Sequence, residues 1–278
     1  MGGWSNLSNA KAIRLKKTKT MKQSGNTILI TGGTSGIGYE MAKEFIKNRN
    51  TVIVTGRNDQ KLQKVKNELN GVVTIKSDVS NPDDIQTLYE HVAKDYPSLN
   101  VLINNAGVMT EINLQKHQLS ATDLTKEIDI SVKGTIWMND AFLPLLKKNK
   151  NAATVTVSSM LAFVPLAITP VYCAAKAALH SYTLSLREQL RNTDVKVFEL
   201  APPATETELL ASFNEEDRKG VSVMPVQAMV ASFLNGFSND KFEICPGQSS
   251  QLRFMSRFFP SFILKQLSKS VTRMQAAN

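Results

Sequence analysis

Cysteine is scarce in this chain of 278 residues, and long apolar runs are missing. Cys173 and Cys245 are its two cysteines, and no signal peptide with an apolar core precedes them. We therefore expect a cytoplasmic protein rather than a disulfide-stabilised secreted one. No stretch approaches the roughly 18 consecutive apolar residues of a membrane-spanning helix, so the sequence predicts none. The composition, with 42% hydrophobic and 21% charged residues, is typical of a globular protein of one or two domains.

Acidic residues are absent from both ends of the chain. Residues 1–20 contain five basic residues and no acidic ones, and neither Asp nor Glu occurs after Glu243. Without the first 20 residues, 28 basic residues stand against 24 acidic ones, so the net charge of +9 comes from the termini. Nucleic-acid binding requires a basic patch on the fold itself, and the sequence argues against one.

The two terminal segments are expected to lie outside the main fold. Residues 1–24 lack a sustained apolar period and include a second methionine, Met21. We interpret them as a disordered leader, an upstream mistranslated start or a cloning remnant, with a basic targeting or membrane-surface arm as the alternative. Residues 251–278 form a basic, aromatic tail that we expect to pack on the domain or on a second subunit. Pro260 divides this tail into short pieces, which disfavours contact with a membrane surface.

Residues 25–250 alternate short β-branched runs with helix-like segments. The strand-like runs are 27–31, 51–55, 72–76, 101–104, 154–158, 195–200 and 242–245. The helix-like segments are 37–49, 59–69, 83–95, 122–148, 173–191 and 225–237. This alternation is typical of βαβ units. The sequence thus predicts one α/β domain, a Rossmann-type doubly wound parallel sheet of about seven strands with helices on both faces.

A glycine-rich loop follows the first strand and opens the first helix. Gly32, Gly36 and Gly38 permit a tight turn and a close approach of the backbone to a pyrophosphate. The amide groups at the start of the following helix would face the phosphates, with a favourable dipole. The order of strand, glycine loop and helix predicts a dinucleotide site, and a purely structural turn is the alternative. The other candidate ligands in this loop are Thr34, Ser35 and Ile37.

The end of the second strand points to the type of dinucleotide. NAD-binding proteins usually have Asp or Glu there, to bind the ribose 2′-hydroxyl. Here the strand runs into Gly56, Arg57 and Asn58, and Asp59 falls in the next helical turn. A guanidinium at Arg57 suits a 2′-phosphate, so the sequence favours NADP over NAD as the cofactor. A solvated surface charge is the alternative reading of Arg57.

Two further strand ends carry candidate cofactor ligands. Asp78 and Val79 follow the third strand, where the Asp78 carboxylate could accept an adenine amino group. After the fourth strand, Asn105, Ala106 and Gly107 are small enough for a ligand to lie against the sheet. Either motif alone is equally typical of a loop that binds no ligand.

The strongest indication of a catalytic site is a tyrosine and a lysine four residues apart. Tyr172 and Lys176 lie one helical turn apart on the same face. We expect the charge of Lys176 to lower the pKa of the Tyr172 phenol, so that it exchanges a proton near neutral pH. Ser158 and Ser159 end the preceding strand, where a hydroxyl could orient a carbonyl or alcohol oxygen. An aromatic and a basic residue on an ordinary amphipathic helix are the alternative.

Together these motifs resemble the short-chain dehydrogenase/reductase family over nearly all of residues 25–247. Tyr172 follows Ser159 by thirteen residues, the spacing usual in that family, which favours Ser159 over Ser158. More narrowly, 165–173 and 201–203 are similar to the DltE-like oxidoreductases, a subgroup whose name describes a genetic neighbourhood. The matching motifs are Thr31–Gly38, Asp78, Asn104–Gly107, Ser159, Tyr172, Lys176 and Pro202–Thr207.

The resemblance implies hydride transfer between a nicotinamide cofactor and a carbonyl or alcohol carbon. It makes Tyr172 the proton donor, Lys176 the ligand of the nicotinamide ribose, and Ser159 the residue that positions the substrate oxygen. Pro202 and Thr207 would lie beside the nicotinamide, with Thr207 bonded to its carboxamide. Family members usually assemble as homodimers or homotetramers. The helix after Tyr172 offers small residues for such packing at Ala174, Ala175, Ala177, Ala178 and Ser181.

This chain departs from the family at two positions. Ser131 stands where the family commonly has an asparagine that links the catalytic lysine to solvent through water. A hydroxyl offers fewer hydrogen-bonding groups than an amide, so the proton relay would be slower. Pro203 replaces the usual glycine and removes a backbone donor beside the nicotinamide. Neither change removes the proton donor, yet Ser131 keeps open a second hypothesis, an NADP-binding sensor or scaffold without turnover.

The substrate side of the site is expected to be apolar. The segment 160–168 after Ser159 is almost wholly apolar, as is the pair Leu209 and Leu210 in the expected lid. An apolar pocket would favour a lipophilic or uncharged small molecule over a sugar phosphate. The alternative is that half of these residues simply pack in the core. No metal is expected.

Overall fold

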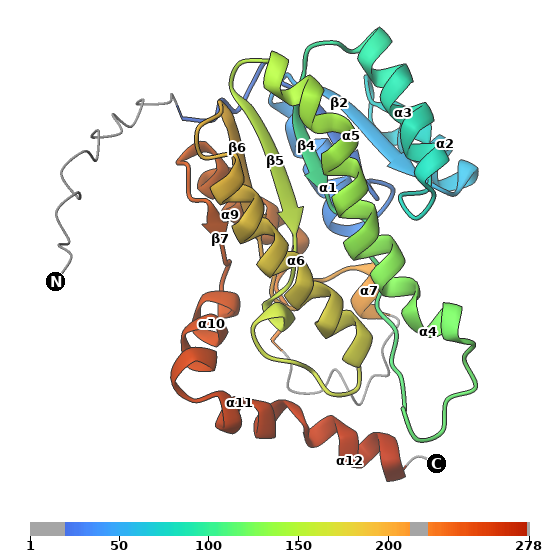
Figure 1. Ribbon diagram of the computed structural model, residues 1–278, viewed down its shortest axis with the longest axis vertical. Helices are drawn as coiled ribbons and strands as arrows, with labels where there is room; N and C mark the ends of the chain where they lie inside the picture. Colours follow the sequence, from blue (N-terminus) through green and yellow to red (C-terminus); the bar gives the residue numbers. More distant parts are fainter. Residues whose placement is uncertain (1–19, 212–221, 277–278) are drawn as a thin grey trace, which may run out of the picture.

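The computed structural model describes residues 20–211 and 222–276 and places seven parallel strands in one sheet (Figure 1). The strands are β1 (Thr27–Thr31), β2 (Thr51–Gly56), β3 (Val73–Lys76), β4 (Leu99–Asn104), β5 (Ala152–Val157), β6 (Val195–Leu200) and β7 (Glu243–Ile244). Their order across the sheet is β3-β2-β1-β4-β5-β6-β7. The chain winds outward from β1 to one edge and from β4 to the other, which confirms the predicted doubly wound sheet.

Helices connect the strands and continue beyond β7 to the end of the described chain. Those of the domain are α1 (Gly36–Lys47), α2 (Asp59–Glu68), α3 (Pro82–Asp95), α4 (Ala121–Glu127), α5 (Gly134–Lys148), α6 (Pro170–Gln189), α7 (Glu208–Ala211) and α9 (Val226–Ser238). Those of the tail are α10 (Gln248–Phe258), α11 (Pro260–Leu267) and α12 (Lys269–Ala276). No described helix is both long enough and apolar enough to cross a bilayer.

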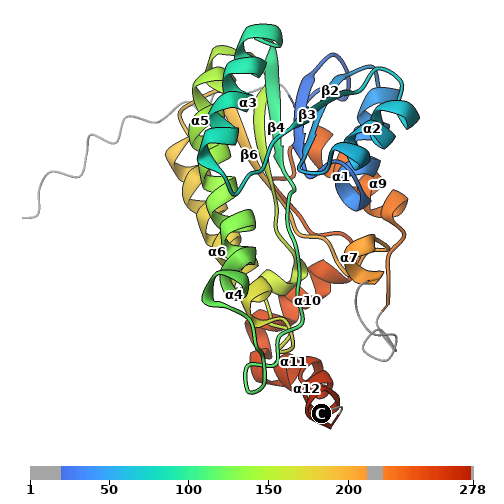
Figure 2. The ribbon, with the colours of Figure 1, turned by 90° about the vertical axis from the view of Figure 1, so that its right-hand side faces the viewer.

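The helices cover both faces of the sheet (Figure 2). On one face α1 and α9 pack together, with Phe45 and Phe233 buried in the core that they share with the strands. On the other face, α3, α5 and α6 enclose a second core around Phe142 and Leu186. Successive strand residues serve opposite faces, so Ile28 points into the first core and Leu29 into the second. Burial on both faces explains why β1, β2 and β4 have apolar residues at successive positions instead of alternating with polar ones.

The helix expected over residues 122–148 is divided into three parts. It consists of α4, a π-helical turn at Ile128–Lys133, and α5. The wider turn places Ser131 at its centre, fully buried from solvent. Short π-helical insertions widen a helix locally and occur frequently at functional sites. Apolar periodicity cannot reveal such an insertion, because the residues on both sides remain helical.

The packed part of the chain begins before the expected boundary at residue 25. Met21 is buried in the core formed with α1 and α9, and its backbone amide donates to the Asp240 carboxylate (3.3 Å). The rest of the expected leader, residues 1–19, lies outside the described residues. A single apolar side chain in a basic, polar stretch gives no periodic signal, which explains why the sequence places this boundary too late.

The tail forms three helices that lie across one end of the domain, below α6 in Figure 1. Helix α10 packs against the short 3-10 turn Met160–Ala162, which follows Ser159. Pro260 begins α11, a position where proline's missing amide costs no hydrogen bond. Phe254 and Phe258 remain 61% exposed on the outer side of α10. The tail therefore contacts the domain while presenting aromatic side chains to solvent.

Candidate active site

A cavity of about 570 Å³ opens at the carboxyl ends of the strands. In an open parallel sheet, this is the edge at which ligands bind. Seventeen of the nineteen residues predicted for the site line it, from Gly32 in the glycine loop to Thr207 ahead of α7. The two exceptions are Gly38, which lies behind the loop, and Ser131, which is buried behind the cavity wall.

The glycine loop is packed too tightly for side chains at two of its positions. Gly32 has a left-handed backbone (φ +63°), and a Cβ there would lie 2.8 Å from the Cα of Ala106. A Cβ on Gly38 would lie 2.5 Å from the side-chain nitrogen of Asn105. Real Cβ atoms do not approach this closely, so these positions need glycine because of the fold of the loop itself.

Asn105 fixes the shape of this loop. Its side-chain amide donates to the carbonyl oxygens of Thr31 and Gly32, both at 3.0 Å. In return, the Thr31 hydroxyl accepts from the backbone amides of Asn105 (3.0 Å) and Ala106 (3.1 Å). Asn105 was expected among the cofactor ligands, and it does line the cavity. Its amide hydrogens, however, are committed to the loop, so it acts as a brace.

The start of α1 faces the cavity through Ser35, Gly36 and Ile37. Ser35 occupies the N-cap position but makes no side-chain hydrogen bond to the helix. The amide groups of the first turn of α1 therefore keep their hydrogen-bonding capacity for an anion, which the helix dipole also favours.

Two ion pairs border the same half of the cavity. Arg57, after β2, lies 3.6 Å from the carboxylate of Asp78, after β3. Lys61, in the first turn of α2, pairs with Glu208 of α7 at 2.7 Å. All four residues line the cavity. Lys61 was not predicted from the sequence, although its place four residues after Arg57 puts both cations on one side of the loop and helix start.

Ser159, Tyr172 and Lys176 come together at the other half of the cavity. Ser159 follows β5, and its hydroxyl caps the 3-10 turn by accepting from the backbone amide of Leu161 (3.1 Å). Tyr172 lies in the first turn of α6, where its ring packs on Leu161. The Lys176 ammonium lies 5.5 Å from the centre of the Tyr172 ring and donates to the backbone oxygen of Val157 (2.9 Å). Helix α6 begins at residue 170, three residues earlier than expected.

Burial dominates the acidity of both groups. It raises the pKa of Tyr172 to about 12, against a smaller lowering by the Ser159 hydroxyl. It lowers the pKa of Lys176 to about 8, against a smaller rise caused by the carboxylate of Glu127. The lowered tyrosine pKa expected from the sequence is therefore wrong. The reason is that withdrawing the phenolate from water costs more than the neighbouring groups return.

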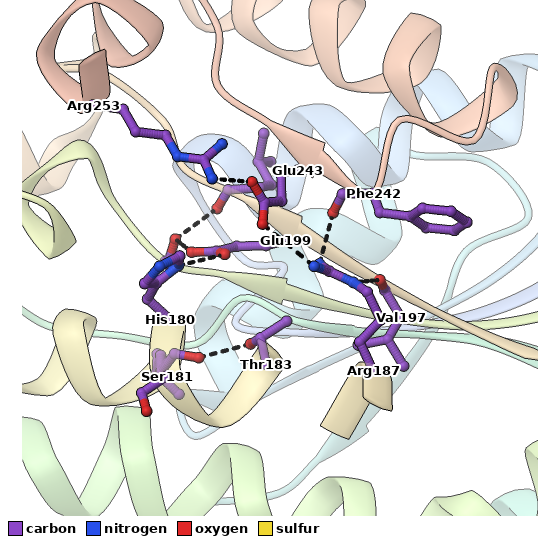
Figure 3. Close-up of polar contacts among 12 residues, drawn as sticks. His180, Ser181, Thr183, Arg187, Val197, Glu199, Phe242, Glu243 and Arg253 are labelled. Atoms are coloured by element: carbon purple, nitrogen blue, oxygen red, sulfur yellow. Dashed lines mark hydrogen bonds and ion pairs between the residues drawn. The ribbon is translucent and has the colours of Figure 1, made fainter. Parts of the chain in front are cut away.

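Ser158 also lines the cavity, and its hydroxyl binds a buried carboxylate. Its hydroxyl donates to the buried carboxylate of Glu199 at 2.6 Å. The second oxygen of Glu199 pairs with Nδ1 of His180 at 2.8 Å (Figure 3). This carboxylate thus ties β5 and β6 to α6 directly behind the cavity wall.

A second set of charges, also drawn in Figure 3, joins the tail to the domain. Glu243 of β7 accepts from both Arg187 of α6 (3.4 Å) and Arg253 of α10. The guanidinium of Arg253 also lies over the ring of Phe163 (5.5 Å to its centre). The same ring meets His180 edge to face, with their centres 5.2 Å apart. Arg253 therefore anchors α10 beside the segment that carries Ser159.

The end of the cavity beyond Tyr172 is apolar. Its side chains come from the loop after β4, the segment after β5, the turn that begins α7, and the tail. They are Met109, Met160, Leu161, Leu166, Ile168, Leu209, Leu210 and Leu267. Val164, by contrast, is buried away from the cavity. The predicted apolar segment thus divides between cavity wall and core.

Glu127 is a buried carboxylate that the sequence analysis missed. It ends α4, is 2% exposed, and accepts a hydrogen bond from the backbone amide of Thr110. Its charge acts on both Lys176 and Tyr172. A single acidic residue in an amphipathic helix is ordinarily solvated, so the sequence carries no signal for its burial. No group of residues suited to a metal ion occurs in the described chain.

Comparisons with known proteins agree with this geometry. Residues 26–218 match the model of the short chain dehydrogenase family. The "Uncharacterized oxidoreductase DltE" of Bacillus subtilis (strain 168) is 41% identical over 239 residues, which span 85% of this chain and 94% of that protein.

Solved structures share the fold at lower identity. A short chain dehydrogenase from Burkholderia cenocepacia J2315 in complex with NADP superposes with a TM-score of 0.77 at 22% identity, covering 89% of this chain and 99% of its own. A short chain dehydrogenase/reductase from Burkholderia phymatum in complex with NAD gives 0.73 at 20% identity, with coverages of 84% and 94%. With the family match over most of its length, this chain belongs to the NAD(P)-dependent short-chain dehydrogenase/reductases.

Proposed function

We propose that the protein is an NADP-dependent oxidoreductase that transfers hydride between the cofactor and an apolar carbonyl or alcohol substrate, with Tyr172 as the proton donor and acceptor. The convergence of Ser159, Tyr172 and Lys176 on one cavity carries this proposal. The cavity continues from these residues to the glycine loop, so one ligand can reach both. Such a juxtaposition of a titratable group and a dinucleotide cradle is what hydride transfer to an oxygen-bearing carbon needs.

The residues of the glycine half fit a nicotinamide dinucleotide. The backbone at Gly32 and Gly38 leaves no room for side chains, and the uncapped start of α1 directs amide groups at the cavity. Pyrophosphate would lie against these amides. Asp78 and Val79 border the place expected for the adenine, and Asn58 the place expected for its ribose. Pro202 and Thr207 border the far end of the same cavity, beside the position proposed for the nicotinamide.

The proposed chemistry assigns one task to each polar residue near Tyr172. A bound nicotinamide dinucleotide supplies or accepts the hydride. During reduction, the Tyr172 hydroxyl donates its proton to the substrate oxygen, while the Ser159 hydroxyl holds that oxygen in place. The ammonium of Lys176, close to the phenol ring, stabilises the tyrosinate that forms. The reverse sequence oxidises an alcohol.

Arg57 and Lys61 support the preference for NADP. Both cations line the cavity next to Asn58, and each pairs with a carboxylate that also lines it. A 2′-phosphate would attract them more strongly than a neutral ribose hydroxyl does. The absence of a carboxylate at the end of β2 works in the same direction, because NAD-binding proteins use one there.

The first test is thermal unfolding with NADPH, with NADH, and without cofactor. A ligand at about one hundred times its dissociation constant adds roughly 2.7 kcal/mol to the free energy of unfolding, enough to raise Tm measurably. We expect NADPH to raise Tm and equimolar NADH to raise it less. Turnover is then measured with a series of apolar ketones and aldehydes. A larger shift with NADH would contradict the NADP preference, and no shift with either would contradict the proposal as a whole.

A sensor that binds NADP without turnover is the second candidate. The observation in its favour is the high pKa of Tyr172, about 12 because of burial, which opposes formation of the tyrosinate in the absence of ligand. We rank this candidate second because a sensor would not need Ser159, Tyr172 and Lys176 to lie together at the cavity.

We also propose that the protein forms a homodimer or homotetramer through α6. Ala174, Ala177, Ala178 and Ser181 form an exposed stripe of small residues on α6, whereas Ala175 points inward. The stripe continues to Leu184, which is 38% exposed. A face of small residues with an apolar end permits close approach of a second helix.

Replacing Leu184 with lysine is expected to produce monomers, because a charge at the centre of a helix interface cannot be solvated there. Light scattering coupled to size exclusion measures the mass directly. Leu114→Lys serves as the control, because Leu114 is exposed on the loop before α4, away from this face. An unchanged mass for Leu184→Lys would contradict assembly through α6.

A further inference from the structure

We propose that Glu127 is a positioning residue for the proposed reaction. Its buried carboxylate relays protons from solvent to Lys176, by way of water beside Ser131. This inference rests on the proposed function, because a proton supply matters only if Tyr172 releases protons. It concerns a residue outside the cavity wall, one helical turn before the position where the family commonly has an asparagine.

The first observation is an oxygen atom without a partner. Oε1 of Glu127 accepts from the Thr110 amide, but Oε2 is buried and has no hydrogen-bond partner among the described residues. A buried carboxylate oxygen without a hydrogen bond is unfavourable in a protein interior. A purely structural acceptor for the Thr110 amide would not need the second oxygen or the charge.

The second observation concerns Ser131, which lies close to Lys176. It follows Glu127 by four residues across the π-helical turn, and its buried hydroxyl likewise has no partner among the described residues. The Ser131 hydroxyl and the Lys176 ammonium approach the same point: a Cβ built on Gly107 would lie 3.4 Å from one and 3.5 Å from the other. Unbonded oxygens facing an ammonium in this way are the usual surroundings of ordered water.

The third observation is electrostatic. Helix α4 packs against α6 (Figure 2), and Glu127 is the described charged group whose field acts on Lys176. The titratable groups that meet here are Glu127, Lys176, Tyr172 and Cys173. Burial raises the pKa of Glu127 and lowers that of Lys176 to about 8. The raised pKa makes the Glu127 carboxylate easier to protonate, which the proposed transfer to Lys176 requires.

The proposed sequence of proton transfers balances at every step. Tyr172 loses its proton to the substrate oxygen and becomes a tyrosinate. The Lys176 ammonium returns a proton to it and becomes a neutral amine. The Glu127 carboxylate takes up a proton from solvent on the side of Thr110, which is exposed. It passes this proton through water beside Ser131 to Lys176, and so returns to the carboxylate while Lys176 returns to the ammonium.

The variant Glu127→Gln tests the charge of the side chain while keeping its size and shape. Glutamine keeps an oxygen that accepts from the Thr110 amide, but it neither carries a charge nor releases a proton at neutral pH. We expect kcat for carbonyl reduction to fall roughly tenfold, at the low end of what positioned proton donors contribute, while KM for substrate and NADPH stays within twofold. Glu40→Gln is the control, because Glu40 is a buried carboxylate of α1 that does not line the cavity.

The pH dependence gives a readout that a structural role would not change. The Glu127 carboxylate raises the pKa of Lys176, so its removal lowers that pKa further below its value of about 8. Reduction needs Lys176 protonated, so the alkaline limb of kcat/KM should move to lower pH in Glu127→Gln. An NMR titration of lysine side chains in the cofactor-free protein, with Lys176→Arg to identify the signal, should show the same displacement.

These measurements separate the failure of this inference from that of the proposed function. An unchanged alkaline limb and an unchanged Lys176 titration in Glu127→Gln would overturn the inference, even if the wild-type enzyme reduces carbonyls. Absence of wild-type turnover would overturn the proposed function, while the NMR titration would still test the coupling of Glu127 to Lys176. If Glu127→Gln lowers Tm strongly, Ser131→Ala replaces it. The Ser131 variant is expected to lower kcat with KM unchanged, and an unaltered kcat there would overturn the inference.

Discussion

Tyr172→Phe should lower kcat for carbonyl reduction by about 10²- to 10⁴-fold, the range that positioned general acids contribute. The substitution removes one hydroxyl and keeps the ring, which packs on Leu161 in a small apolar cluster. Because the tyrosine is 7% exposed and its pKa lies near 12, its removal takes away a neutral hydroxyl and no charge. We therefore expect Tm to change little and NADPH affinity to stay within threefold.

Tyr182→Phe is the matched control for this experiment. Tyr182 lies on the same helix, α6, but packs in the core with Leu186 and does not line the cavity. Tyr182→Phe thus removes the same hydroxyl group at a position that does not contact the substrate or the cofactor. Steady-state rates with NADPH and an apolar ketone, together with cofactor titrations, decide the outcome. If Tyr172→Phe retained more than a third of the wild-type kcat, the assignment of Tyr172 as proton donor would be wrong.

The same pair of variants separates an enzyme from a sensor. A sensor would show no turnover in the wild type, and Tyr172→Phe would bind NADPH as the wild type does. An enzyme would lose turnover in Tyr172→Phe and keep it in Tyr182→Phe.

Arg57→Ala should weaken NADPH binding by about ten- to a hundredfold and leave NADH binding nearly unchanged. The expected loss corresponds to one charge-assisted hydrogen bond, worth roughly 1.5–3 kcal/mol. Arg57 is half exposed, with its guanidinium 3.6 Å from Asp78, so it can turn toward a phosphate without disturbing the core. The measurement is the dissociation constant of each cofactor for each protein, by fluorescence or calorimetry.

Lys64→Ala controls for a general loss of positive charge. Lys64 is an exposed residue of α2 that pairs with Glu68 and does not line the cavity. It should leave both dissociation constants unchanged. Equal losses of NADPH and NADH affinity in Arg57→Ala would show that Arg57 supports the shape of the site without recognising a 2′-phosphate. If the positive charge of the site attracted both cofactors without a specific phosphate contact, high salt would weaken the binding of NADPH and NADH alike.

The sheet was predictable because its signals are local. Each strand is a short run rich in β-branched or apolar residues, so β1 and β6 match their predicted ranges and the other strands differ by one or two residues at an end. The glycine loop and the Tyr172–Lys176 pair could also be predicted, because each lies within a single loop or a single helical turn. Fold and family therefore followed from the sequence.

The remaining features depend on contacts between distant parts of the chain. Glu127 is buried only because α4 packs against α6, and the π-helical turn that holds Ser131 leaves no mark on apolar periodicity. The pKa of Tyr172 moved opposite to the prediction because a sequence shows a neighbouring charge but not the loss of water. Likewise, the commitment of Asn105 to the loop became visible only once Thr31 and Gly32 were placed beside it.

The anchorage of the tail bears on how this chain can change over evolutionary time. The glycine loop and strand ends are tied to the sheet core, whereas Leu267 reaches the cavity from α11, which follows α10, the helix that Arg253 anchors to Glu243 and Phe163. Mutations in the last helices can therefore reshape one wall of the cavity at little cost to the stability of the sheet. A lineage that keeps the anchor is free to explore new substrates with the same cofactor machinery.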